Sequence, residues 1–337
     1  NLSMAMETFT IANVTALPTA ENGNGDNGTN PTGTFPDAQT DETHDMGFAF
    51  LDYGDLPESG NGDHFNSTMV EGGAVHVIVP GFKLGTLIDG EQDGAPSATA
   101  NGDDADNTDD EDGVTFTSPL IPGNNATISV TSMNPTGGNA VLQGWIDWDN
   151  NGLLDGGEAL AFTSNVVPTG NATTTYTFPV PAAAIFNDGM VFARFRLSPA
   201  GGLSPDGPDK YGVPAVPQGE VEDYKLNVGK IGNLVWEDRN FDGLQQPGEP
   251  GINGAIVTLV WAGPNGTIDN GGDDVTYASL TTGTPTFDAG EYYYCGLIPG
   301  SYKMIYSSPA NMTPTRPNQG SQVNGGTLDA DGTITGM

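Results

Sequence analysis

The apolar residues of this chain come in short runs of Val, Ile, Thr, Tyr and Phe, which are separated by clusters of Gly, Asn, Asp and Pro. No stretch keeps the apolar period of a helix over several turns. The 49 glycines and 25 prolines are too many interruptions for a helical protein, because both residue types break helices and favour turns. The pattern predicts an all-β chain, and strands this short at this spacing favour tandem β-sandwiches over a parallel α/β sheet.

Shifts in composition divide the chain into three segments. Residues 1–50 are predicted to be an N-terminal arm or linker, residues 51–228 a first β-sandwich module, and residues 229–337 a second. The predicted strands span 46–50, 74–79, 114–117, 126–131, 141–147, 173–180, 191–197, 231–236, 255–261, 275–280, 291–295 and 301–306.

The 43 acidic residues outnumber the nine Lys and Arg and give a formal charge of −34. Such a charge excludes nucleic acid as a partner and disfavours an anionic membrane surface. No apolar run approaches the ~18 residues of a membrane span, so we expect no membrane insertion. The acids either keep the protein soluble by self-repulsion or serve as metal ligands. Their grouping in Gly- and Asn-rich loops at ligand spacing favours the second interpretation.

The first loop, residues 147–158, matches the calcium-loop pattern D-x-[DN]-x-[DN]-G-x5-E in full. Side-chain oxygens at its first, third and fifth positions converge on the ion, a glycine permits the sharp turn, a backbone carbonyl follows, and the final glutamate contributes two oxygens. The predicted ligands are Asp147, Asp149, Asn151, Leu153 through its carbonyl, Asp155 directly or through water, and Glu158.

The pattern recurs in residues 238–249, where the predicted ligands are Asp238, Asn240, Asp242, Leu244, Gln246 and Glu249. A single match in an Asp- and Gly-rich chain would fit a bare polar turn, but two full matches favour Ca²⁺ as a cofactor with two or more sites. Predicted strands, not helices, precede both loops. We therefore expect calcium to fasten long connections between strands, not to open a helix pair as in a sensor.

Two further groups are weaker candidates. Seven acids lie within ten residues of the 103–112 run, and Asp103, Asp106 and Asp109 are its candidate ligands; the alternative is a solvated loop. Asp269, Asp273 and Asp274 form the other group. The acids Asp52, Asp55, Asp89, Glu91 and Asp93 fit turn positions better than metal positions.

Residues from Lys230 onward resemble the calcium-binding B-type repeat of serine–aspartate repeat adhesins. The resemblance rests on the run IGNLVWEDRNFDGLQQPGEPGINGAIVTL at 231–259 and the run DAGEYYYCGLIPGSY at 288–302. It implies an immunoglobulin-like sandwich that carries calcium on the second loop. Asp269, Asp273 and Asp274 also resemble a further calcium loop of such modules.

Residues 51–228 resemble a module common in bacterial surface proteins that is named for its ending, here GEVEDY at 219–224. The runs GWIDWD at 144–149, FARFRLS at 192–198 and DYGD at 52–55 fit it, as does the acidic stretch 101–113. Both resemblances imply an extracellular or cell-surface structural protein, and neither implies catalysis.

B-type repeats usually end with a strand after an Asp-x-Asp-Gly stretch, whereas this sequence stops shortly after 329–332. Residues 1–50 look like such an ending. We hypothesise that the N-terminal arm of one copy donates a strand to the second module of another, which would build a head-to-tail homopolymer, or filament. The alternatives are a covalent tandem of such units and an arm with no role.

Other functions remain as alternatives. An enzyme is disfavoured because the sequence holds no nucleophile elbow, zinc-binding or phosphate-binding motif. A surface adhesin that binds a host protein or glycan is the main alternative, with the aromatic residues at 261 and 292–294 as a candidate platform. Glycans on the protein itself are expected at eight Asn-x-Ser/Thr sequons, which begin at Asn1, Asn13, Asn27, Asn66, Asn125, Asn171, Asn265 and Asn311.

Overall fold

The computed structural model describes residues 49–58, 65–102, 110–186, 189–207, 216–269, 272–284, 287–315 and 333–334. Residues 50–337 form one compact unit, and residues 1–49 form another that lies outside the described residues except for its last position. The described residues hold strands and no helix, which confirms the all-β class, and no helix long and apolar enough to cross a membrane occurs among them. The expected donor strand in the N-terminal arm lies outside the described part.

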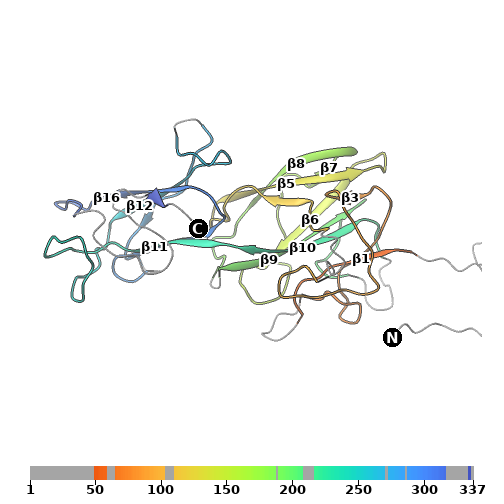
Figure 1. Cartoon of the computed structure of the whole chain (residues 1–337), viewed down its shortest axis with the longest axis horizontal. Coiled ribbons are helices and arrows are strands. Elements are labelled where there is room, and N and C mark those ends of the chain that lie inside the picture. Colours follow the sequence, from red (N-terminus) through yellow and green to blue (C-terminus); the bar gives the residue numbers. More distant parts are fainter. Residues whose placement is uncertain are drawn as a thin grey trace, which may run out of the picture. The chain divides into compact units, whose positions relative to one another are not determined.

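The described part of the first module contains ten strands, which pair antiparallel. Figure 1 labels most of them. One sheet has the order β10-β9-β6-β7, a second has β3-β5-β4 with β8 also paired to β5, and β1 pairs with β2. The strands are β1 (Leu51–Tyr53), β2 (Val75–Val77), β3 (Lys83–Leu84), β4 (Val114–Phe116), β5 (Asn125–Asn134), β6 (Ala140–Ile146), β7 (Val166–Val167), β8 (Gly170–Pro179), β9 (Met190–Ser198) and β10 (Glu220–Asn227).

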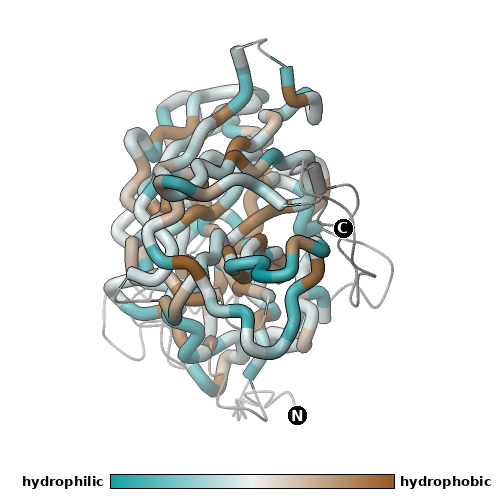
Figure 2. The backbone as a smooth tube through the Cα atoms, turned by 90° about the vertical axis from the view of Figure 1, so that its left-hand side faces the viewer, coloured by the Kyte–Doolittle hydropathy of each residue, from teal (hydrophilic) through white to brown (hydrophobic). Residues whose placement is uncertain are grey.

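Alternation along the strands builds the core of this module. In β5 the even-numbered residues are buried, so Ile128 and Val130 face inward while their neighbours are half-exposed. Strand β9 is buried at eight successive positions, because it lies in the middle of its sheet between β10 and β6. Phe178 and Phe195 join the same apolar cluster, and burial of each such side chain contributes about 1.5–3 kcal/mol. Figure 2 shows hydrophobic and hydrophilic residues interleaved along the tube.

The second module has its own apolar cluster, which includes Val257, Leu259, Tyr292 and Tyr294. Strand β11 pairs with β15, while β12 pairs with β16 and with the short β13 and β14. The strands are β11 (Gly229–Leu234), β12 (Ile256–Trp261), β13 (Val275–Thr276), β14 (Leu280–Thr281), β15 (Glu291–Leu297), β16 (Tyr302–Ser307) and β17 (Thr333–Ile334).

The last strand of the second module is short. β17 pairs with β16 only at Tyr302 and Lys303, opposite Ile334 and Thr333. The strand that we expected to be missing at this end is therefore present for two residues. The rest of that β16 edge, Met304–Ser307, has no strand partner among the described residues.

Candidate metal-binding loops

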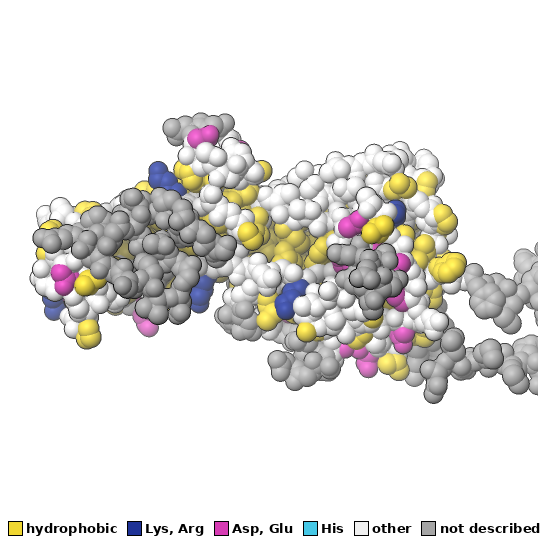
Figure 3. Space-filling model, viewed as in Figure 1, with side chains coloured by type: hydrophobic (Ala, Val, Ile, Leu, Met, Phe, Trp, Pro, Cys, Tyr) yellow, Lys and Arg dark blue, Asp and Glu magenta, His cyan; other side chains and the backbone are white. Residues whose placement is uncertain are grey.

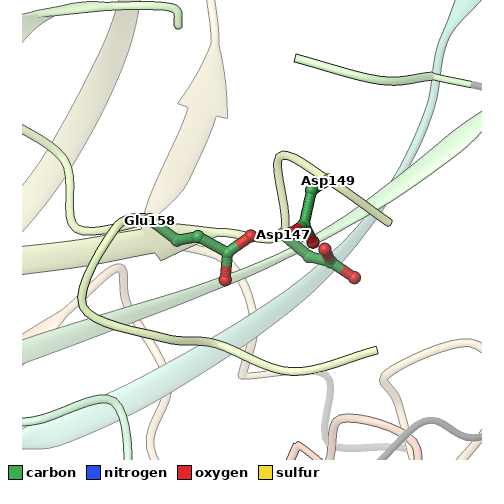
Figure 4. A group of neighbouring side chains, drawn as sticks. All are labelled: Asp147, Asp149 and Glu158. Atoms are coloured by element: carbon green, nitrogen blue, oxygen red, sulfur yellow. The ribbon is translucent and has the colours of Figure 1, made fainter. Parts of the chain in front are cut away.

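The first predicted loop begins directly after β6. It ends before Ala159, which forms an isolated bridge back to Trp145 of β6. Left-handed backbone at Asn150 and Gly152 turns the chain sharply, with φ of 54° and 78°. As a result, carboxylate oxygens of Asp147, Asp149 and Glu158 lie within 4.8 Å of one another. Figure 4 shows Glu158 pointing toward the two aspartates from the far side of the loop.

Backbone amides hold the first loop in this shape. Asp147 accepts hydrogen bonds from the amides of Asn151 (3.1 Å) and Gly152 (3.0 Å). Glu158 accepts from the amides of Trp148 (2.7 Å) and Asp155 (2.9 Å). The loop's own backbone amides therefore hold the carboxylates of Asp147 and Glu158, two of the predicted ligands, in place.

The second loop repeats this network position by position. Asp238 accepts from the amides of Asp242 (3.2 Å) and Gly243 (2.8 Å), and Glu249 accepts from those of Arg239 (3.0 Å) and Gln246 (2.9 Å). Each bond has its counterpart at the same offset in the first loop, and left-handed residues recur at Phe241 (φ 60°) and Gly243 (φ 79°). The two loops are identical at five of their twelve positions and differ at the other seven, so the common motif positions specify the shape.

The two loops differ in burial. Asp147 and Glu158 are only 3% and 4% exposed. This burial raises the pKa of Asp147 above its usual value, and it raises the pKa of Glu158 to about 7. Neither forms a salt bridge with a described Lys or Arg. In the exposed second loop, hydrogen bonds lower the pKa of Asp238, chiefly one from the Thr315 hydroxyl, and that of Asp242, chiefly one from the Leu244 amide.

The donor set of the first loop fits a hard divalent cation. Oxygen ligands predominate, and two buried carboxylates lack a cationic side chain beside them in the described part of the chain. Burial of uncompensated charge costs several kcal/mol per ion, which a bound cation would offset. The second loop offers amides at two ligand positions, Asn240 and Gln246, and its three acids do not gather within 4.8 Å.

The third predicted group does come together. Carboxylate oxygens of Asp269, Asp273 and Asp274 lie within 4.8 Å of one another beside a hollow that Lys303 also lines. One oxygen of Asp274, Oδ1, is buried without a hydrogen-bond partner among the described residues. The remaining predicted ligands, Asp103, Asp106 and Asp109, lie outside the described residues.

Sequence reasoning missed a buried polar centre in the first module. Arg194 forms a fully buried salt bridge with Asp223, with Nε and Oδ1 2.7 Å apart. Asp52 and Asp55, which we expected in turns, are 2% and 0% exposed, and Asp52 lies within β1. His76 lies in β2, and its Nε2 accepts a hydrogen bond from Arg196. Arg194 and Asp223, like Arg196 and His76, are far apart in the sequence, so no local motif predicts that they pair.

The aromatic residues predicted as a binding platform are mostly core. Trp261, Tyr292 and Tyr294 are 6%, 2% and 3% exposed. Of the described sequons, those at Asn125, Asn171, Asn265 and Asn311 have exposed asparagines.

Comparison with known proteins identifies both modules. Residues 229–336 match the sequence model of the SdrD B-like domain, and residues 141–227 match that of the GEVED domain. Serine-aspartate repeat-containing protein F of Staphylococcus epidermidis (strain ATCC 12228 / FDA PCI 1200) is 38% identical over 112 residues, which are 33% of this chain and 6% of that protein. Serine-aspartate repeat-containing protein D of Staphylococcus aureus (strain Newman) is 37% identical over 112 residues, 33% of this chain and 7% of that protein.

The chain therefore carries an SdrD B-like domain preceded by a GEVED domain, which confirms the resemblances seen in the sequence. The relatives are serine-aspartate repeat-containing proteins, and the predicted extracellular or cell-surface location is confirmed. The similarity supports a surface module of the kind that serine-aspartate repeat-containing proteins carry. The chain spans only 6–7% of the length of these relatives.

Proposed function

We propose that this chain is a calcium-stabilised structural subunit of a bacterial cell-surface or extracellular filament. The observation that carries the proposal is the shared amide network of the two loops, which holds the first and last acids of each loop in the same way, once in each module. Structural staples suit a chain with many long connections between short strands.

Calcium in these loops would act on stability. It would bind the side-chain oxygens of Asp147, Asp149 and Glu158, and of Asp238, Asp242 and Glu249. A site filled at tenfold over its Kd contributes ~1.4 kcal/mol to the free energy of unfolding. If the affinities are those of extracellular modules, near 10⁻⁴–10⁻³ M, the sites fill only where calcium is about millimolar. The subunit would then be rigid outside the cell and weaker where calcium is scarce.

Assembly by strand addition is the second part of the proposal. The β16 edge from Met304 to Ser307 has no strand partner among the described residues, which supports it as the acceptor. Residues 1–50 of another copy are the proposed donor. Because donor and acceptor lie in different parts of the chain, the contact is head-to-tail and extends into an open filament.

The calcium proposal is tested by thermal unfolding of the full chain in millimolar calcium and after chelation. We expect a reversible drop in Tm on chelation. The double variants Asp147→Asn/Glu158→Gln and Asp238→Asn/Glu249→Gln should each lose part of that difference, whereas Glu71→Gln, at an exposed position, should keep all of it. Equal Tm values in both conditions, together with no calcium bound by mass spectrometry, would refute the proposal.

The assembly proposal is tested by sedimentation of the full chain and of a chain without residues 1–50. The full chain should form large species in calcium that dissociate under denaturing conditions to subunits of about 35 kDa. The truncated chain should stay monomeric until a peptide of residues 1–50 is added, which it should bind. A full chain that remains monomeric and binds a protein or glycan instead would favour the adhesin alternative.

A further inference from the structure

The name-giving glutamates of the GEVED domain are buried. Glu220 and Glu222 lie two positions apart on β10 and are 0% and 1% exposed. Because side chains in a strand alternate, both lie on the same face. Glu220 accepts a hydrogen bond from the amide of Leu84 in β3, and Glu222 accepts one from the amide of Gly113 (2.8 Å).

More carboxylates surround this pair. Glu220 interacts electrostatically with Glu222, Asp52 and Asp110, and Glu222 with Asp110 and Asp112. Asp110 is itself 6% exposed and accepts a hydrogen bond from the amide of Asp89 (3.0 Å). The cluster thus joins β10 to the segments at 84–89 and 110–113.

The buried basic groups that the structure describes do not balance this charge. Besides the metal-loop acids, the described residues of the first module include six buried carboxyl groups and two buried guanidinium groups; these are Asp52, Asp55, Asp110, Glu220, Glu222, Asp223, Arg194 and Arg196. Arg194 is committed to Asp223, and Arg196 donates to His76 and to backbone carbonyls. Glu220 and Glu222 form no salt bridge with a described Lys or Arg.

Protonation alone does not satisfy the cluster. One oxygen of Glu220, Oε1, is buried without a hydrogen-bond partner among the described residues, and so is Oδ1 of Asp89. A proton on Glu220 Oε1 would need an acceptor within hydrogen-bond distance, and the described residues provide none. A bound cation would account for both the unpartnered oxygen and the excess of buried carboxylates. It would accept lone pairs from that oxygen and offset the negative charge.

We propose that Glu220 holds a divalent cation of the oxygen-ligated class, such as calcium, inside the first module, with one of its neighbours Glu222 and Asp110 as a second carboxylate ligand. Within the described residues only the two groups named above bring three carboxylates within 4.8 Å. The ion is therefore bound by one or two carboxylates at a time, with backbone oxygens and water completing its shell. It fastens β10 to β3 and to the 110–113 segment, and it does not depend on either loop.

The test counts the calcium ions bound to the full chain by native mass spectrometry. We expect the double variant Glu220→Gln/Glu222→Gln to carry one ion fewer than the unchanged chain, because a neutral amide is a much poorer ligand than a carboxylate. Glu71→Gln, which changes an exposed glutamate of the same module, should keep the full count. An unchanged count in the double variant would overturn the proposal.

The loop variants separate this site from the proposed function. Asp147→Asn/Glu158→Gln combined with Asp238→Asn/Glu249→Gln should remove the loop ions and leave the ion at Glu220. If the double variant fails to fold, the unchanged chain decides the matter: anomalous scattering from a bound lanthanide should give a peak about 2.3–2.6 Å from Glu220 Oε1. A peak at the loops with none at Glu220 would overturn this inference and leave the loops in place.

Discussion

The side chains of Arg194 and Asp223 are both completely buried, so the charge of each is balanced by that of the other. Asp223 also accepts the amides of Asp55 (2.7 Å) and Leu56 (3.0 Å) through Oδ2. We expect Asp223→Asn to lower the free energy of unfolding by about 3–5 kcal/mol, because it leaves a buried guanidinium without its counter-charge. Urea unfolding in calcium measures the change.

The matched control is the exposed pair of Arg239 and Glu237, whose side chains are 58% and 48% exposed. Solvent screens such pairs, so Glu237→Gln should change stability little. If Asp223→Asn were as mild as Glu237→Gln, the buried pair would not be a stabilising element of the module.

Glu158 predicts a pH dependence of the metal-free protein. Its ordinary pKa of 4.5 is raised by burial to about 7 in the folded state, so the folded protein holds this proton more tightly than the unfolded chain. The corresponding stability is present below pH 4.5, declines as the pH rises toward 7, and is absent above it. Unfolding free energies measured in chelator from pH 4 to 8 should show this decline.

Glu158→Gln removes the titrating group, so its profile should be flatter over the same window. In millimolar calcium the dependence should reverse, because the ion binds the deprotonated carboxylate. A variant whose profile parallels that of the unchanged chain would show that Glu158 does not titrate there.

At the residue scale, what could be predicted depended on sequence separation. The ligands of each loop lie within twelve residues of one another, so their spacing alone predicted them. Glu220 accepts a hydrogen bond from Leu84 in β3, and Arg194 donates one to Ser67; both partners are more than a hundred residues away. A single sequence does not show which of its distant residues are close in space. The contacts and burial of these residues are therefore seen only in the folded structure.

At the scale of elements, strands with an apolar alternation were predicted well. The runs at 126–131 and 291–295 lie within β5 and β15. The run at 173–180 lies in β8 except for its last residue, Val180. Strand β10 was missed because its sequence, EVEDYKLN, reads as a polar segment. Its acids are buried by the polar centre, so the usual rule that charge faces solvent fails for this strand.

Gly219 marks the start of β10 and should tolerate no side chain. Its φ of 135° is a conformation that favours glycine, and a Cβ there would lie 1.8 Å from the carbonyl oxygen of Leu197 in the neighbouring strand. We expect Gly219→Ala to destabilise the module by at least the ~1–3 kcal/mol of a strained backbone. Gly138→Ala, where a Cβ meets nothing within 4 Å, is the control.

Urea unfolding of the two alanine variants makes the comparison. A loss confined to Gly219→Ala supports the close approach of β10 to β9. Equal stability of both variants would mean that the chain around residue 219 adjusts freely, against the geometry of this strand start.

At the scale of the whole molecule, the charge of −34 sets the conditions for stability. Figure 3 shows acidic side chains at several separate places on the face in view. In the metal-free protein these charges repel one another, and folding brings them closer together than in the unfolded chain. Salt shortens the reach of that repulsion, since the Debye length falls from about 30 Å at 0.01 M to about 3 Å at 1 M.

We therefore expect sodium chloride to raise the Tm of the chelated protein over this range, and to raise it less once calcium is bound, because the ions already neutralise the most crowded acids. Magnesium chloride at matched ionic strength is the control for calcium, since magnesium demands a tighter octahedral shell than these loops present. Equal salt responses with calcium, with magnesium and after chelation would mean that bound calcium does not relieve the repulsion. In that case the acids would act only as a solubilising surface.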